Sequence, residues 1–99
     1  MPSQFREVDP RELRLPSSRQ DGPDPVKLHR QIARFGALSN GMPPLEVYEG
    51  TDGFLVVYNG VTRATRIAKL APGTLVSVEL IGRLRRAYGP ERKIGDLLS

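Results

Sequence analysis

Apolar and polar residues alternate along the chain with two different periods, one helical and one extended. Three apolar side chains recur at i, i+4 and i+7 and predict an amphipathic helix over 25–35: Leu28, Ile32 and Phe35. Asp24 is a good N-cap for this helix, Pro25 suits its first position, and Gly36 is a typical stop. A second helical pattern covers 61–70, and Ala-Pro-Gly closes it.

The remaining apolar residues predict short strands at 5–8, 45–48, 54–58 and 75–81. In the second of these, Leu45 and Val47 alternate with polar positions, whereas the run 54–58 (FLVVY) predicts a strand buried on both faces. Asp52-Gly53 between them is a hairpin signal. Residues 11–15 fit either a helical turn or an extended piece. Together the elements predict one small α/β domain of the α+β type, with a mixed sheet and two main helices.

Composition limits the classes of protein to which the chain can belong. It has 99 residues, 38% of them apolar and 26% charged, which is enough for one globular domain. Cysteine is absent, so disulfides, thiolate metal sites and cysteine nucleophiles are excluded. The N-terminal residues MPSQFREVDP contain no apolar stretch typical of a signal peptide, and no window suggests a membrane span. We therefore expect a cytoplasmic protein without a membrane partner.

The net charge of +4 is concentrated at the C-terminus. Residues 83–99 carry five basic and two acidic groups, that is +3 of the total: Arg83, Arg85, Arg86, Arg92 and Lys93 against Glu91 and Asp96. We expect this basic tail to follow a domain that spans 1–82 and to be the least ordered part, except for one helical turn at 94–98. It is either a solvated terminus or a contact for nucleic acid or an acidic protein partner.

The most informative stretch is the strand–turn–helix junction at 58–66 (YNGVTRATR). A buried strand leads into the tight Asn59-Gly60 turn, and the next helix presents free N–H groups and the positive end of its dipole there. Gly60 permits close approach of a ligand, Thr62 adds a hydroxyl, and Arg63 adds a bidentate donor suited to phosphate. The junction predicts an anion site.

Helical spacing favours Arg63 as the principal ligand. The apolar positions of the second helix fill one arc: Ala64, Ile67, Ala68, Leu70 and Ala71. Arg63 falls inside this arc and Arg66 at its edge, while Thr62, Thr65 and Lys69 lie on the polar side. An arginine that faces the core needs a counter-charge, because a buried unpaired charge is costly. That partner is either a carboxylate of the same fold or a bound anion.

Other candidates carry weaker signals. His29 is the only histidine and lies on the polar side of its helix, which is typical of a surface residue. Arg19 is either a loop charge or a further contact to the same site. The segment 41–44 (GMPP) is either a rigid entry to a strand or the frame of a pocket. No pair of carboxylates is spaced for acid–base catalysis, although Asp9, Glu12 and Asp52 could fold toward the site.

The order of elements, with the runs QIARFG, PPLEVY and GFLVVYNGVTRATRIAKLAPGTLVSVELI, resembles the N-terminal domain of the ParB and sulfiredoxin-like superfamily over residues 5–82. Its most specific part is the turn at 59–63. Sulfiredoxin has its catalytic cysteine where Val61 stands here, which excludes sulfinic acid reduction. ParB has Gly-Glu-Arg-Arg at this turn and grips the triphosphate of CTP. Gly60 and Arg63 match that motif, whereas Val61 and Thr62 depart from it.

The resemblance implies phosphate binding through Gly60, Thr62 and Arg63, with a nucleoside triphosphate and Mg²⁺ as the expected ligand. The missing carboxylate at position 61 counts against hydrolysis. ParB continues into a helix-turn-helix, which this sequence lacks, so sequence-specific DNA reading is not expected. Three functions stay open: a regulatory nucleotide- or phosphate-binding module with Asn59, Gly60, Thr62, Arg63 and Arg66 at its site, a protein-interaction domain, and an ATP-using or nuclease-type enzyme.

Overall fold

A computed structural model describes residues 4–38 and 41–98. Four strands form one mixed sheet in the order β1-β4-β2-β3. Their bounds are β1 (Gln4–Val8), β2 (Leu45–Glu49), β3 (Leu55–Asn59) and β4 (Val76–Arg83). β2 runs parallel to β4, while the other two pairs, β1 with β4 and β2 with β3, are antiparallel. The chain is therefore a small α+β domain with a mixed sheet, which confirms the predicted fold class.

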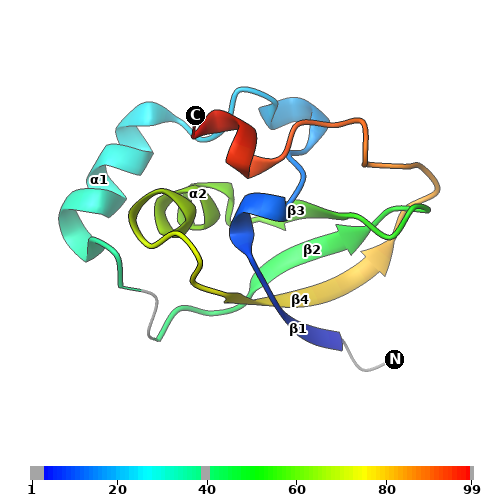
Figure 1. Cartoon of the computed structure of the whole chain (residues 1–99), viewed down its shortest axis with the longest axis horizontal. Coiled ribbons are helices and arrows are strands. Elements are labelled where there is room, and N and C mark those ends of the chain that lie inside the picture. The colour runs from blue at the N-terminus through cyan, green and yellow to red at the C-terminus, as the bar shows by residue number, and fades with distance from the viewer. Residues whose placement is uncertain (1–3, 39–40, 99) are drawn as a thin grey trace.

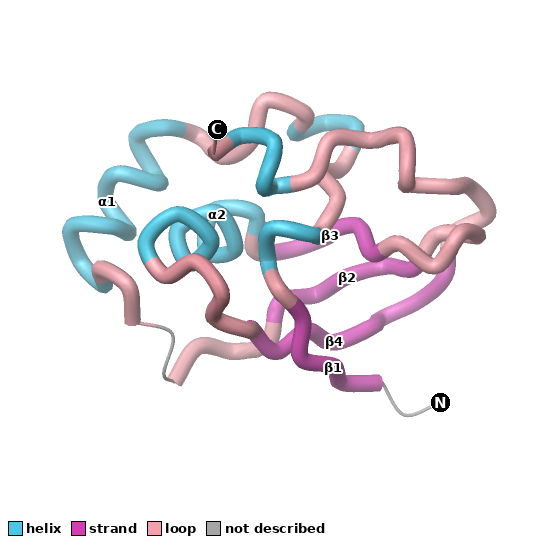
Figure 2. The backbone as a smooth tube through the Cα atoms, viewed as in Figure 1, coloured by secondary structure: helices cyan, strands magenta, loops and turns pink. Residues whose placement is uncertain are grey.

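The two main helices are α1 (Pro25–Phe35) and α2 (Val61–Leu70), with the bounds that the sequence predicts. The Asp24 carboxylate accepts from Val26 N at 2.8 Å, and Gly36 ends α1 with a positive φ of 56°. The strands gather on one side of the molecule and the helices on the other (Figures 1 and 2). α2 packs on the sheet, and α1 lies outside α2 (Figure 1).

The core lies between the sheet and α2. Alternating residues of the strands point into it, as Leu45 and Val47 do in β2 and Val76, Val78 and Leu80 do in β4. By contrast, α1 has no fully buried residue. Leu28 and Ile32 are half-buried, and Phe35 is 43% exposed, so the predicted apolar stripe only partly meets the body of the protein.

The prediction for 54–58 needs a correction. Its middle residues are buried, but Phe54 and Tyr58 are 42% and 64% exposed. The reason is that β3 is the last strand of the sheet. Its outer edge is covered near Arg14, whose backbone N–H donates to Leu55 O at 2.8 Å and whose carbonyl accepts from Val57 N at 3.1 Å. This cover protects the middle of β3 and leaves its two ends open.

The segment from 83 onward is not a detached tail. β4 extends to Arg83, and a last helical turn, η3 (Ile94–Leu97), returns to the core beside a first one, η1 (Pro10–Glu12). Ile94 is fully buried, and Leu97 and Leu98 pack against the same cluster. Two backbone bonds hold this return: Leu15 N to Arg92 O and Ile94 N to Leu13 O. The expected boundary after residue 82 is wrong, because the sparse apolar groups of this segment complete the core.

Replacing Ile94 with alanine should therefore lower the free energy of unfolding by about 2–5 kcal/mol, the usual cost of truncating a fully buried aliphatic side chain. Leu75→Ala, at a position that is 55% exposed, is the matched control and should change stability by less than about 0.5 kcal/mol. Urea denaturation measures both. Equal stabilities of the two variants would show that the C-terminal segment does not belong to the core.

Two further predictions concern membrane spans and residues 11–15. Within the part of the chain that the structure describes, neither helix has the length and apolar character that a membrane span requires. Residues 11–15 combine both alternatives that the sequence leaves open, since η1 ends at Glu12 and an extended piece follows. The segment 41–44 enters β2, as one of its two alternatives predicts, and residues 39–40 before it lie outside the described residues.

Candidate functional site

A cavity of about 550 Å³ opens where β3 passes into α2, which is the junction that the sequence singles out. We call it the β3–α2 cavity. Its lining comes from three parts of the chain: Pro16, Ser18 and Arg19 from the segment before α1, Lys27 and Gln31 from α1, and residues 57–63. Four of the predicted site residues, Asn59, Gly60, Thr62 and Arg63, line it, and Arg66 does not.

The backbone of the cavity floor depends on Gly60. This residue is the N-cap of α2 and has φ 111° and ψ 22°, a left-handed conformation that glycine adopts without strain. A Cβ at this position would collide with Leu45 Cδ2 in the core and would lie 3.1 Å from Arg63 Nη2. No side chain of the described residues caps α2 by a hydrogen bond, and residues 61–63 of its first turn, whose N–H groups have no partner within the helix, line the cavity. The sequence prediction of a tight glycine turn is confirmed.

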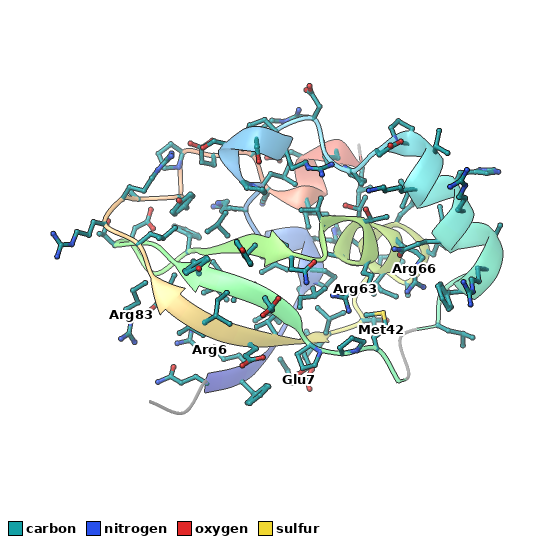
Figure 3. All side chains as sticks on the ribbon, turned by 180° about the vertical axis from the view of Figure 1, so that it is seen from behind. Arg6, Glu7, Met42, Arg63, Arg66 and Arg83 are labelled. Carbon is teal, nitrogen blue, oxygen red and sulfur yellow. The ribbon has the colours of Figure 1, made fainter. Side chains whose placement is uncertain are left out.

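Arg63 is half-buried and lies at the surface of the protein, contrary to the prediction that it faces the core. Its Nη1 donates to the carbonyl oxygen of Pro43 at 2.9 Å. The loop before β2 thus holds the guanidinium in place through a single neutral acceptor. Figure 3 shows Arg63 between α2 and this loop. Among the described residues no carboxylate forms an ion pair with Arg63.

Arg66, predicted at the edge of the apolar arc, is instead the buried arginine, with 1% of its surface exposed. Its Nη1 donates at 2.8 Å to the carbonyl oxygens of Gly36 and Leu38. Its Nε contacts Gln31 Oε1 at 3.3 Å, and its Nη2 contacts Met42 Sδ at 3.1 Å. The two carbonyl groups lie just after the C-terminal end of α1, where carbonyl groups are free and a positive charge is favourable.

Arg66 is therefore held by contacts within the fold, and it does not line the cavity with the other predicted site residues. The helical arc is misleading because α2 contacts α1 as well as the sheet, so its buried surface includes Thr65 and Arg66. Burial, and after it the charge of nearby Arg63, lower the pKa of the Arg66 guanidinium. Two arginine charges thus lie close together while their direct partners are neutral oxygen and sulfur atoms.

The charged side chains that line the β3–α2 cavity are all basic in the described part of the chain. Arg19, Lys27 and Arg63 contribute three cations, and no acidic residue belongs to the lining as far as the structure describes it. Within residues 4–38 and 41–98, none of these three cations forms an ion pair with a carboxylate. Asn59 faces Glu46, which accepts from its amide nitrogen at 3.1 Å. The arrangement suits an anion of the size of a phosphate group or larger.

The carboxylates that could have supplied catalytic groups are engaged elsewhere. Asp9 accepts from Arg11 N at 2.9 Å, and Glu12 lies 3.6 Å from Lys93 Nζ. Asp52 accepts from the backbone N–H groups of Tyr88 and Gly89. Burial raises the pKa of Asp52, but these backbone bonds outweigh it and leave that pKa below its ordinary value.

The sequence does not predict the part of the lining that α1 supplies, Lys27 and Gln31. Lys27 and Gln31 lie one helical turn apart and thus share a face of α1, but nothing in the linear pattern connects that face with Gly60. Arg19 lines the cavity, in agreement with the alternative that it is a further contact to this site and not only a loop charge. His29 is exposed and does not line the cavity.

The basic groups of the C-terminal segment are largely neutralised. Four of its five cations lie within 4.0 Å of a carboxylate: Arg83 of Glu49, Arg86 of Glu91, Arg92 of Asp21, and Lys93 of Glu12. This segment is therefore a weaker candidate for an anionic ligand than the β3–α2 cavity, where three cations without an ion pair among the described residues share one lining. Among the described residues no group of three histidine, cysteine, aspartate or glutamate side chains is arranged to hold a metal ion.

Comparison of the chain with protein-family models, with curated proteins and with solved structures finds no match in any of the three.

Proposed function

We propose that this chain is a nucleotide- or phosphate-binding module and that the β3–α2 cavity is its ligand site. The observation that carries the proposal is the set of three cations, Arg19, Lys27 and Arg63, around one cavity whose lining contains no acidic residue. Cations from three separate elements converge there without a protein counter-charge among the described residues. A bound anion relieves their mutual repulsion, and this favours phosphate over neutral ligands.

The geometry of the turn adds to this preference. The first turn of α2 offers backbone N–H groups, Thr62 adds a hydroxyl, and Arg63 adds a planar guanidinium suited to two phosphate oxygens. Arg63 is oriented by the Pro43 carbonyl, so its conformation is partly fixed before a ligand arrives. The volume of about 550 Å³ falls in the usual range for small-molecule sites.

A ParB-like identity is part of this proposal, and it rests on the turn at 59–63. Gly60 and Arg63 occupy the places that the ParB motif requires, while Val61 and Thr62 differ. The proposed role is regulatory: ligand binding without sequence-specific DNA reading. The location that fits a nucleotide ligand is the cytoplasm, where nucleotides are abundant, and magnesium would arrive with a triphosphate.

A thermal-shift screen tests this function. Inorganic phosphate, inorganic triphosphate and the common nucleoside triphosphates are added with and without magnesium, each against a chloride control of equal ionic strength. A ligand at a hundred times its Kd stabilises a protein by about 2.7 kcal/mol, and we therefore expect Tm to rise by roughly 10 °C or more. An unchanged Tm with every phosphate compound would contradict the proposal.

A protein-interaction domain is the second candidate, and the surface around α1 favours it. Val26, Phe35 and Leu38 are 57%, 43% and 65% exposed, although they belong to or directly follow a helix that contributes nothing to the deep core. Exposed apolar groups of this kind are typical of contact surfaces. If no phosphate compound raises Tm while the protein is folded, this candidate replaces the first.

A further inference from the structure

The sheet has one face that no helix of the described chain covers. Core residues of β2 and β4 point toward α2, and the residues that alternate with them point to the opposite side, where Figures 1 and 2 show no helix. Directly paired residues of neighbouring strands share a side of the sheet. Strand pairing thus adds residues of β1 to this side, which we call the outer sheet face; its members include Phe5, Glu7, Glu46, Ser77 and Glu79.

Aromatic rings occupy part of the outer sheet face. Tyr48 follows the core residue Val47 in β2 and therefore points to this side. Its ring contacts that of Tyr58 edge to face, with the centroids 5.4 Å apart. Tyr58 lies in a bulge of β3, has no partner on β2 and is 64% exposed, and Phe5 is 61% exposed. Aromatic groups gathered on one exposed surface are typical of a contact surface.

The charged groups of the outer sheet face are all acidic in the described part of the chain. Glu7, Glu46 and Glu79 belong to it, and none of them forms an ion pair with a described residue. Glu46 and Glu79 lie directly opposite each other on neighbouring strands, where like charges repel. The basic residues of the described strands both pair with Glu49 instead: Arg6 and Arg83. A basic surface would therefore complement this face.

The outward face of α1 has that complementary character. Leu28 and Ile32 are half-buried, and helical spacing places Val26, Arg30 and Arg34 on the opposite side of the helix. All three are exposed, and neither arginine forms an ion pair within residues 4–38 and 41–98. The sequence of α1, PVKLHRQIARF, contains no acidic residue. This helix face combines positive charge with an apolar group, as the outer sheet face combines negative charge with aromatic groups.

We propose that the outer sheet face of one molecule binds the outward face of α1 of a second copy of this chain. α1 packs on α2, and α2 covers the other face of the sheet, so the two complementary surfaces lie on different sides of one molecule (Figure 1). Each copy offers one surface of each kind, so the contact is heterologous and builds open rows or a closed ring. The inference goes beyond the proposed function, because its central charges, those of Arg34, Glu46 and Glu79, do not line the β3–α2 cavity.

The dimensions of the two surfaces set the strength of this association. The 11 residues of α1 extend over about 16 Å at 1.5 Å per residue, and four strands about 4.8 Å apart span roughly 14 Å. The helix thus fits across the sheet. A contact made by one short helix falls in the class of small transient interfaces, below about 1,200 Å² in total. We expect weak association that depends on charge and therefore on salt.

Sedimentation velocity over a series of protein concentrations, at low and at high ionic strength, tests the inference with single charge reversals. Arg34→Glu changes the face of α1 and Glu79→Lys changes the outer sheet face, while Arg85→Glu, at an exposed position after β4, is the matched control. Glu79→Lys places a cation opposite Glu46, and Arg34 is exposed, so neither change disturbs the core. Circular dichroism checks that all variants fold.

We expect the sedimentation coefficient of the wild-type protein to rise with concentration at low ionic strength and to keep the monomer value at high ionic strength. Arg34→Glu and Glu79→Lys should each weaken association roughly tenfold, whereas Arg85→Glu should behave as the wild type. An equimolar mixture of Arg34→Glu and Glu79→Lys should associate again, because the intact sheet face of the first meets the intact α1 of the second.

Three results would overturn the inference. A wild-type protein that stays monomeric at every concentration at low ionic strength would exclude self-association. Weakening by only one of the two charge reversals, or a mixture of the two variants that stays monomeric, would show that the copies do not meet through these two surfaces. Triphosphate binding is measured separately, so none of these results decides the proposed function.

Discussion

Replacing Arg66 with alanine should lower the free energy of unfolding by about 2–3 kcal/mol, which corresponds to a fall in Tm of roughly 10–20 °C for a domain of this size. The variant removes the donor that serves the carbonyl oxygens of Gly36 and Leu38, each at 2.8 Å. It also leaves a void next to Met42, because Arg66 is only 1% exposed in the wild-type protein. Because these contacts tie α1 to α2, α1 should separate first. Thermal and urea denaturation measure the loss.

The matched control is Arg30→Ala, because Arg30 is an exposed arginine of α1 that does not line the β3–α2 cavity. Its effect on stability should stay within about 0.5 kcal/mol. Arg66→Lys keeps the charge but loses the forked donor geometry, so it should fall between alanine and the wild type. If Arg66→Ala were as stable as Arg30→Ala, the anchoring role of Arg66 would be refuted.

Replacing Arg63 with alanine should weaken ligand binding and change stability little, whereas replacing Arg66 should mainly lower stability. It should weaken binding of inorganic triphosphate by roughly tenfold or more, since a charge-assisted hydrogen bond typically contributes about 1.5–3 kcal/mol. The cost to stability should be below about 1 kcal/mol, because the side chain makes one solvent-accessible bond to Pro43. Isothermal titration calorimetry gives the Kd, and Arg30→Ala again serves as the control.

A large loss of stability for Arg63→Ala together with unchanged triphosphate binding would contradict this assignment. It would indicate that Arg63 is a structural arginine like Arg66. The two variants together therefore separate the arginine that holds the fold from the arginine that is free to hold a ligand.

The helix bounds could be predicted from the sequence because their signals are local. Asp24 and Gly36 fix the ends of α1 through contacts within a few residues. Gly60 likewise marks the start of α2, because only glycine fits its φ of 111° above Leu45. The strand–turn–helix junction followed from the same local information, whereas the contribution of α1 to the cavity beside it did not.

The roles of the two arginines could not be predicted, because they depend on distant contacts. Arg66 is buried by the end of α1, some 30 residues earlier in the chain, and no pattern within α2 reveals those carbonyl acceptors. A helical wheel assumes one buried face, whereas α2 contributes to the core under the sheet and also contacts α1. Leu70, on the predicted apolar arc, is the last residue of α2 and is 37% exposed.

Dependence on distant contacts also explains why the sequence reveals neither the burial of the C-terminal segment nor the exposure of the end of β3. Ile94 is isolated among polar residues, so no local pattern marks it as a core residue. Its burial depends on distant contacts, among them the hydrogen bonds from Ile94 N to Leu13 O and from Leu15 N to Arg92 O. Tyr58 ends an apolar run and therefore resembles a buried residue, but the position of β3 at the end of the sheet and the local bulge leave it open. Register and strand order are properties of the assembled sheet and not of any one strand.

The central claim is that an anion binds in the β3–α2 cavity. Amide chemical shifts measured by nuclear magnetic resonance report both binding and its location, when inorganic triphosphate is titrated into the ¹⁵N-labelled protein. The account predicts saturable shifts for the amides of Gly60, Val61, Thr62 and Arg63, with smaller changes at Arg19 and Lys27 on the other side of the cavity. The amides of η3 and β1 should stay unchanged. Absence of any saturable shift, or shifts confined to residues 83–93, would contradict an anion site at the β3–α2 cavity.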